Sequence, residues 1–171
     1  MPSFPIISPE KFFQPFFSSL NAALTAADWK SMPGHDEDGY VPSNTGGKLR
    51  IQYWSKRDYE DPNINDLSIG VAWHASEAEA KNYYSGLIKR SLLPIAQPFV
   101  GLEMPGCDEF AAQVLSIPSS DNILTIVVRY GNYVFNITVL AKSDGYFPDL
   151  ETFKNDAKAF DANIHRLLTN A

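Results

Sequence analysis

Hydrophobic and polar positions alternate most regularly between Ile123 and Leu140, and this alternation predicts a β-hairpin. Two apolar, β-branched runs flank Gly131-Asn132. A glycine at the first central position suits a two-residue type II′ turn, because glycine tolerates the positive φ required there. Such a turn places four apolar pairs on one face, and we expect that face in the core. The pairs are Tyr130 with Tyr133, Val128 with Phe135, Ile126 with Ile137, and Leu124 with Val139.

The opposite face of the hairpin is mixed, since it carries Arg129, Val127, Val134 and Asn136. A one-residue slip would exchange the two faces, so the register is well specified. We expect the mixed face to be half covered, either by a helix of the same chain or by a partner. Arg129 then either pairs with an acidic residue on a neighbouring strand or marks a binding groove.

Three further segments have the pattern of strands: residues 49–55, 67–74 and 110–117. Residues 30–48 are rich in turn-forming residues, which predicts a long surface loop. Residues 91–106 hold three prolines among irregular apolar residues. We expect this segment to be a packed connection.

Three helices are predicted. Ser8-Pro9-Glu10 resembles a helix start, but Pro15 predicts a break, with the main helix running from Pro15 to about Ala27. Ser76 and Glu79 form a capping box, which predicts a helix to about Arg90. Asp149 caps the last helix. Apolar residues at three- and four-residue steps give that helix one core-facing stripe: Leu150, Phe153, Ala157, Phe160, Ile164 and Leu167.

The elements follow the order α-β-β-α-β-β-β-α. This order predicts the α+β class, with a mainly antiparallel sheet of about five strands covered by helices. No internal repeat or linker divides the chain. We expect residues 1–14 to form an N-terminal aromatic arm and residues 15–171 to form a single α+β domain.

The aromatic arm has two interpretations. Adjacent pairs such as Phe12-Phe13 point in different directions, so one helix face cannot bury them both. The segment either wraps its own core or docks on another chain, since large exposed apolar patches mark interfaces. The candidate interface residues are Phe4, Phe12, Phe13, Trp54, Trp73 and Arg129.

Composition excludes several classes of partner. The 171 residues carry a net charge of −6 and a pI near 5.0, which argues against nucleic acid and anionic membrane surfaces. No apolar run has the roughly 18 residues that a membrane span needs.

Cys107 is the only cysteine, so no internal disulfide can form. The N-terminus lacks the pattern of a signal peptide, so we expect either a cytoplasmic protein or one whose signal was removed.

Candidate chemistry is sparse, and no catalytic, cofactor-binding or metal-binding residue is predicted. Asp108 and Glu109 follow Cys107 and should raise the pKa of its thiol, which disfavours a nucleophile. An enzyme would need His74 or His165 to approach this thiol in space. The acidic segments 35–38 and 58–66 lack metal-binding spacing, although they leave adventitious cation binding open.

Two segments carry a family resemblance. Met104-Pro-Gly-Cys-Asp-Glu-Phe-Ala-Ala112, followed by Val127-Val-Arg-Tyr-Gly-Asn-Tyr-Val134, resembles a pattern in exported bacterial lipoproteins and sensor-like domains. The LpqN-like lipoproteins, whose fold is similar to the PsbP-like α/β/α sandwich, are of this kind. The resemblance spans roughly residues 67–168. It implies ligand or protein binding outside the cytoplasm, and it implies no catalytic residues.

We therefore expect a non-catalytic binding or sensor-like module of an exported bacterial protein. Its partner would be a protein or a small molecule. The alternative is an accessory or self-assembling subunit of a larger complex, docking through the aromatic N-terminus. Without export, the chain would act in the cytoplasm.

Overall fold

The computed structural model describes residues 7–32, 37–40, 47–56, 66–116, 122–141 and 149–169. The helices are α1 (Pro9–Ala26), α2 (Glu77–Ser91) and α3 (Leu150–Thr169). The strands are β1 (Lys30–Ser31), β2 (Glu37–Tyr40), β3 (Lys48–Ser55), β4 (Leu67–Trp73), β5 (Gln97–Pro98), β6 (Glu109–Leu115), β7 (Asn122–Tyr130) and β8 (Tyr133–Ala141). The predicted α+β class is confirmed.

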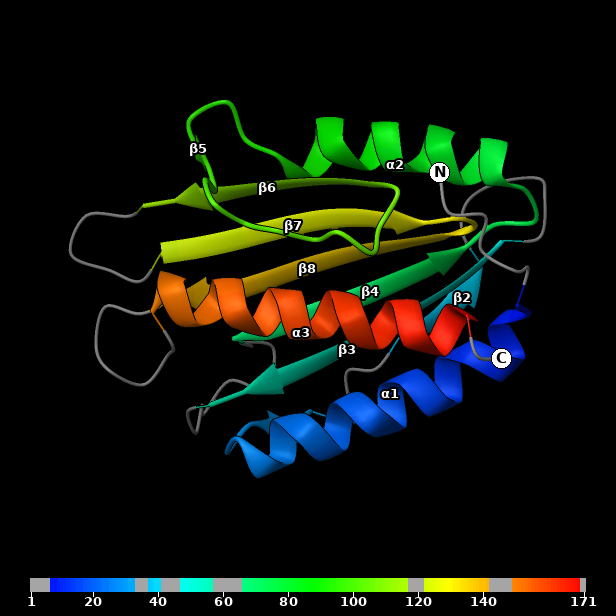
Figure 1. The fold of residues 1–171 in the computed structure, drawn as a ribbon, viewed down its shortest axis with the longest axis horizontal. Coiled ribbons are helices and arrows are strands. Elements are labelled where there is room, and N and C mark those ends of the chain that lie inside the picture. Colours follow the sequence, from blue (N-terminus) through cyan, green and yellow to red (C-terminus); the bar gives the residue numbers. More distant parts are fainter. Residues whose placement is uncertain are drawn as a thin grey trace.

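One antiparallel sheet organises the chain (Figure 1). Seven strands lie side by side in the order β1-β3-β4-β8-β7-β6-β5, and β2 pairs with β3 as well. The prediction of about five strands was therefore wrong in number. The five long strands lie where the sequence predicts them, but the long loop expected over residues 30–48 contains β1 and β2. A two-residue strand such as β1 or β5 is too short to show a hydrophobic period.

The hairpin of β7 and β8 has the predicted register. Tyr130 lies opposite Tyr133, and Val128 lies opposite Phe135. Gly131 has a φ of +56°, whereas Asn132 has no positive φ, as a type II′ turn requires. The apolar face of this hairpin packs against α1 and α3, where Phe135 and Ile164 are fully buried.

The mixed face of the hairpin is covered by α2 of the same chain. Ala80, Tyr84 and Leu87 of this helix pack on Val127 and Val134. The sheet thus lies between two helical layers, with α1 and α3 on one side and α2 on the other. The mixed face is therefore not left open for a partner.

Helix α1 begins at Pro9 and continues through Pro15, so the predicted break at Pro15 was wrong. A proline inside a helix costs about 3 kcal/mol. Burial of Phe12, Phe16 and Phe17, each at most 3% exposed, offsets this cost, since each large apolar side chain contributes about 1.5–3 kcal/mol. Residues 9–14 therefore belong to the same packed unit as the rest of the domain.

The predicted caps of α2 and α3 are confirmed. Ser76 Oγ accepts a hydrogen bond from the Glu79 backbone N–H at 3.2 Å, and Asp149 Oδ1 accepts one from the Thr152 N–H at 2.8 Å. Among the residues that the structure describes, no helix is both long and apolar enough to cross a bilayer.

Candidate binding surface

Among the described residues, the most exposed large apolar side chains lie at the β5 edge of the sheet. Ile95 is 74% exposed and Val100 is 79% exposed, and they lie on either side of β5. Leu93 and Phe110 are also exposed, at 45% and 38%. Residues 91–102 contain no charged side chain. We call residues 93–101 the edge loop.

The edge loop is anchored to the sheet. Gln113 of β6 is buried, and its amide accepts a hydrogen bond from the Leu93 N–H at 3.1 Å and donates one to the Ser91 carbonyl at 3.4 Å. At the other end of the loop, the Phe99 N–H donates to the Ala112 carbonyl at 3.0 Å. The loop therefore presents its apolar side chains from a fixed backbone.

A glycine closes the far end of the edge loop. Gly101 has a φ of +84°, a conformation that other residues rarely adopt. Lys154 of α3 lies against this turn, and its ammonium group lies 6.0 Å from the centre of the Phe99 ring. The contact joins the loop to α3, so both helical layers border the edge.

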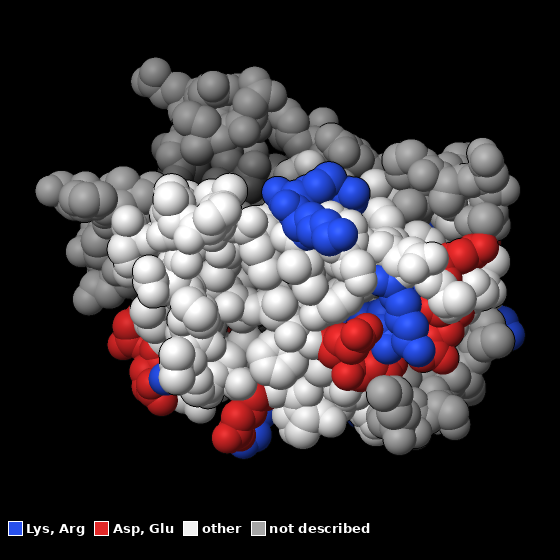
Figure 2. Space-filling view, turned by 90° about the horizontal axis from the view of Figure 1, so that it is seen from above, with Lys and Arg blue, Asp and Glu red and all other residues white. Residues whose placement is uncertain are grey.

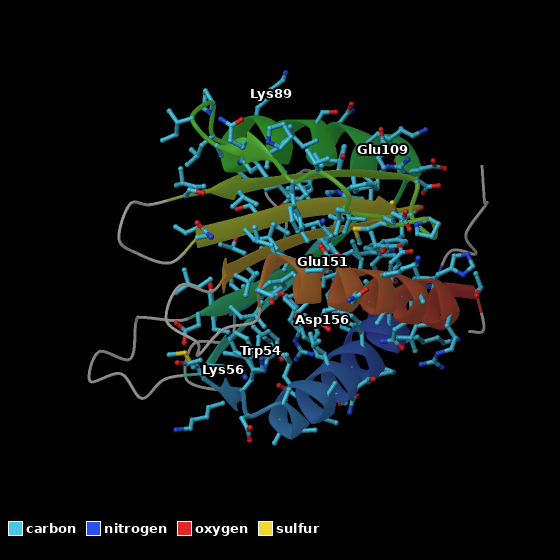
Figure 3. The ribbon with its side chains drawn as sticks, turned by 60° about the vertical axis from the view of Figure 1, so that its left-hand side comes forward. Trp54, Lys56, Lys89, Glu109, Glu151 and Asp156 are labelled. Atoms are coloured by element: carbon cyan, nitrogen blue, oxygen red, sulfur yellow. The ribbon has the colours of Figure 1, made fainter. Side chains whose placement is uncertain are left out.

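Two cations border the edge loop on the α2 side. Lys89 and Arg90 are exposed in the last turn of α2, directly before the uncharged segment. Within the described part of the chain, neither of them has an acidic partner. Lys89 extends away from the body of the protein (Figure 3). Figure 2 shows this side of the molecule, with a group of basic side chains beside a broad uncharged surface.

The hairpin turn, by contrast, is closed by an ion cluster around a buried arginine. Arg129 is fully buried, and its Nε donates to Glu109 at 2.6 Å. Its Nη1 lies 3.3 Å from both Asp108 and Glu77 and donates to the Gly131 carbonyl at 2.9 Å. This arginine is therefore paired with acidic groups of the same chain. Of the two predicted alternatives for Arg129, the structure contains the first, which is pairing with an acidic residue on the neighbouring strand.

Cys107 lies beside this cluster and is not activated. Burial, followed by the charges of Asp161 and Asp108, raises the pKa of the thiol to about 12. The Sγ–H donates to the Met104 carbonyl at 3.1 Å. The predicted direction of the pKa shift is thus confirmed, and the thiol is protonated at neutral pH.

His74 is 2% exposed, and neither of its ring nitrogens has a hydrogen-bond partner among the residues that the structure describes. Its ring lies 4.8 Å from that of Tyr83 in α2, centre to centre. Burial lowers the pKa of this imidazole, and the charge of Glu79 opposes that shift in part. Because its nitrogens have no partner, His74 forms no hydrogen bond with Cys107.

The residues predicted to form an interface are mostly buried within the chain. Phe12 is 3% exposed, Trp54 is 1% exposed and Arg129 is completely covered. Trp54 lies between β3 and α1, where its Nε1–H donates to Asn21 Oδ1 at 2.7 Å. Phe13 and Trp73 are partly buried against the same core. These five residues therefore do not make an exposed docking surface. Four of them lie in or against the core between α1 and the sheet, and Arg129 lies on the opposite face, beside Glu77 of α2. Phe4 is outside the described residues.

The acidic segments 35–38 and 58–66 lie largely outside the described residues as well. Among the side chains that the structure does describe, no group of three His, Cys, Asp or Glu residues is placed to hold a metal ion.

The exposure of the edge loop differs from the packed connection that the sequence predicts over residues 91–106. That prediction is right for Leu102 and Met104, which are buried in the core. It is wrong for the edge loop, because the side chains of Ile95 and Val100 face solvent. The uncharged run over residues 91–102 was the available signal.

Comparisons with protein families, curated proteins and solved structures gave no match for this chain.

Proposed function

We propose that this chain is a non-catalytic binding module and that the edge loop is its binding surface. One observation carries the proposal: Ile95 and Val100 are about three-quarters exposed on a loop whose backbone is anchored at both ends. When a partner covers exposed apolar side chains, the free energy of the complex falls by roughly 1.5–3 kcal/mol for each side chain that becomes fully buried. A fixed backbone lowers the entropy cost of that binding.

Three described groups that could perform chemistry, those of Cys107, Arg129 and His74, are already occupied or are inaccessible. The raised pKa of Cys107 leaves little thiolate at neutral pH. Arg129 is covered and bound to acids, and His74 is only 2% exposed. These placements favour binding over catalysis.

A sensor-like role outside the cytoplasm remains part of the proposal. It is supported by the resemblance of Met104–Ala112 and the hairpin to segments of exported bacterial lipoproteins. Docking through the aromatic N-terminus is less favoured, since Phe12, Phe16 and Phe17 are buried in the core.

Photo-crosslinking in the native cell tests the proposal. A benzophenone amino acid would replace Ile95 or Val100, with exposed Ala162 on α3 as the matched control site. Benzophenone inserts into C–H bonds of proteins and of lipids alike, so either kind of partner is captured. We expect defined adducts from both edge-loop sites and none from the control site. Equal labelling at all three sites would overturn the proposal.

A further inference from the structure

We propose that the edge loop inserts into the interface of an anionic lipid bilayer, with Lys89 and Arg90 bound to the headgroups. This inference rests on the proposed function and names the occupant of the same surface. It differs from the expectation drawn from net charge, which argued against anionic membranes.

The shape of the surface favours a bilayer over a flat protein partner. Ile95 and Val100 lie in two turns on either side of β5, and the loop that leads into β5 arches outward beyond β6 at the edge of the sheet (Figure 1). Two projecting aliphatic side chains can enter between headgroups without a complementary cavity. Strand addition at this edge is disfavoured, because β5 has only two residues and one of them is Pro98.

The charges are placed as an anionic surface requires. Residues 91–102 carry no charge, so insertion takes no ionised group out of water. Lys89 and Arg90 have long aliphatic stems, which keep the charged ends at headgroup level while the loop enters. Among the described residues, Lys89 and Arg90 have no acidic partner, and the Arg90 guanidinium lies 5.8 Å from the centre of the Tyr83 ring.

The acids of the first turn of α2 do not cancel this attraction at physiological ionic strength, and Glu103, two residues beyond the edge loop, is paired with Lys158 at 3.1 Å. The acids Glu77 and Glu79 lie in the first turn of α2, whereas Lys89 lies in the last. At 1.5 Å per residue, Glu77 and Lys89 are roughly 18 Å apart along the helix. That distance exceeds the Debye length of about 8 Å, so the loop and its cations act largely independently of those acids.

Sedimentation with sucrose-loaded vesicles tests the inference. The probes are vesicles of 70% phosphatidylcholine and 30% phosphatidylglycerol, and vesicles of phosphatidylcholine alone. We expect binding to the mixed vesicles, and at least about fivefold weaker binding to the neutral ones, since each basic residue contributes roughly fivefold. Binding to the mixed vesicles should weaken as salt is raised.

Two variants separate the apolar and the ionic contributions. Ile95→Ser with Val100→Ser should lower partitioning about tenfold or more, and Ala159→Ser with Ala162→Ser on α3 is the matched control. Lys89→Glu with Arg90→Glu should abolish the preference for anionic vesicles. Lys11→Glu with Arg166→Glu carries the same change of charge on α1 and α3 and should not. All of these positions are exposed, so thermal unfolding should confirm intact folding.

Three results would overturn the inference. The first is no binding to either kind of vesicle. The second is binding that both serine pairs change equally, and the third is binding that both charge-reversed pairs lower equally. If vesicles fail but the Val100 crosslinker captures one defined protein, the bilayer is excluded and the binding-module proposal stands. If neither a lipid nor a protein adduct forms, both proposals fail.

Discussion

Tyr130 Oη donates a hydrogen bond to Asp161 Oδ1 at 2.6 Å, which joins β7 to α3 inside the core. The other carboxylate oxygen of Asp161 accepts the backbone N–H of Gly106 at 2.7 Å. Asp161 is 2% exposed. One buried carboxylate thus connects the hairpin, the last helix and the segment that leads from the edge loop into β6.

Asp161→Ala should therefore destabilise the fold by about 2–4 kcal/mol, because it leaves a buried hydroxyl and a buried N–H without partners. Asp161→Asn keeps an acceptor oxygen and should cost less. Urea unfolding measures both. The prediction fails if the alanine variant is no less stable than the asparagine variant.

Arg129→Ala should cost about 3–5 kcal/mol, because it leaves the buried carboxylate of Asp108 without its cation. Arg129→Lys should restore only part of this loss, since lysine cannot donate to Glu109 and the Gly131 carbonyl with the same fork geometry. Arg166→Ala on the exposed face of α3 is the control, with an expected change within about 0.5 kcal/mol. Similar losses for the two alanine variants would contradict the role given to Arg129.

His74 should make the stability depend on pH. The unfolded chain binds a proton on this imidazole near pH 6.5, whereas burial lowers the pKa in the folded protein. Between these two values the unfolded state binds more protons, so stability rises with pH. The contribution is fully present above about pH 6.5 and is lost as the pH falls through the folded pKa.

The measurement is the free energy of unfolding from pH 5 to 8 for the wild type and for His74→Phe, which retains a ring against Tyr83. The wild type should lose up to about 1.4 kcal/mol per pH unit more than the variant below pH 6.5. Parallel curves for the two proteins would show that another group causes the pH dependence.

Cys107 should react slowly with iodoacetamide in the folded protein. Raising the thiol pKa from 9.0 to about 12 lowers the thiolate fraction at neutral pH about a thousandfold. Mass spectrometry should show alkylation that accelerates at least about a hundredfold in urea, where burial and the neighbouring carboxylates are lost. Rapid labelling of the folded chain at pH 7 would contradict this account of the site.

Short-range patterns were sufficient for much of the fold. The register of the hairpin follows from one turn and the alternation of its strands, and the caps at Ser76 and Asp149 follow from local hydrogen bonding. Other features depend on partners far away in the sequence. The helix continues through Pro15 because Phe12 and Phe16 pack against Tyr133 and Phe135 of β8. A short stretch of sequence around the proline does not contain these distant residues.

By itself, the sequence determined the class, the five long strands, the core face of the hairpin and the shift in the pKa of Cys107. The first three depend on a fixed period or on neighbours within a few residues. For Cys107, the adjacent Asp108 gave the direction of the pKa shift, whereas its two largest causes, burial and the charge of Asp161 on α3, come from the tertiary structure. Only the tertiary structure decided which apolar residues face water. It buried Phe12 and Trp54, which looked available for docking, and it exposed Ile95 and Val100, which looked packed. The reason is physical: hydrophobicity is a property of a side chain, whereas burial depends on which distant elements cover it.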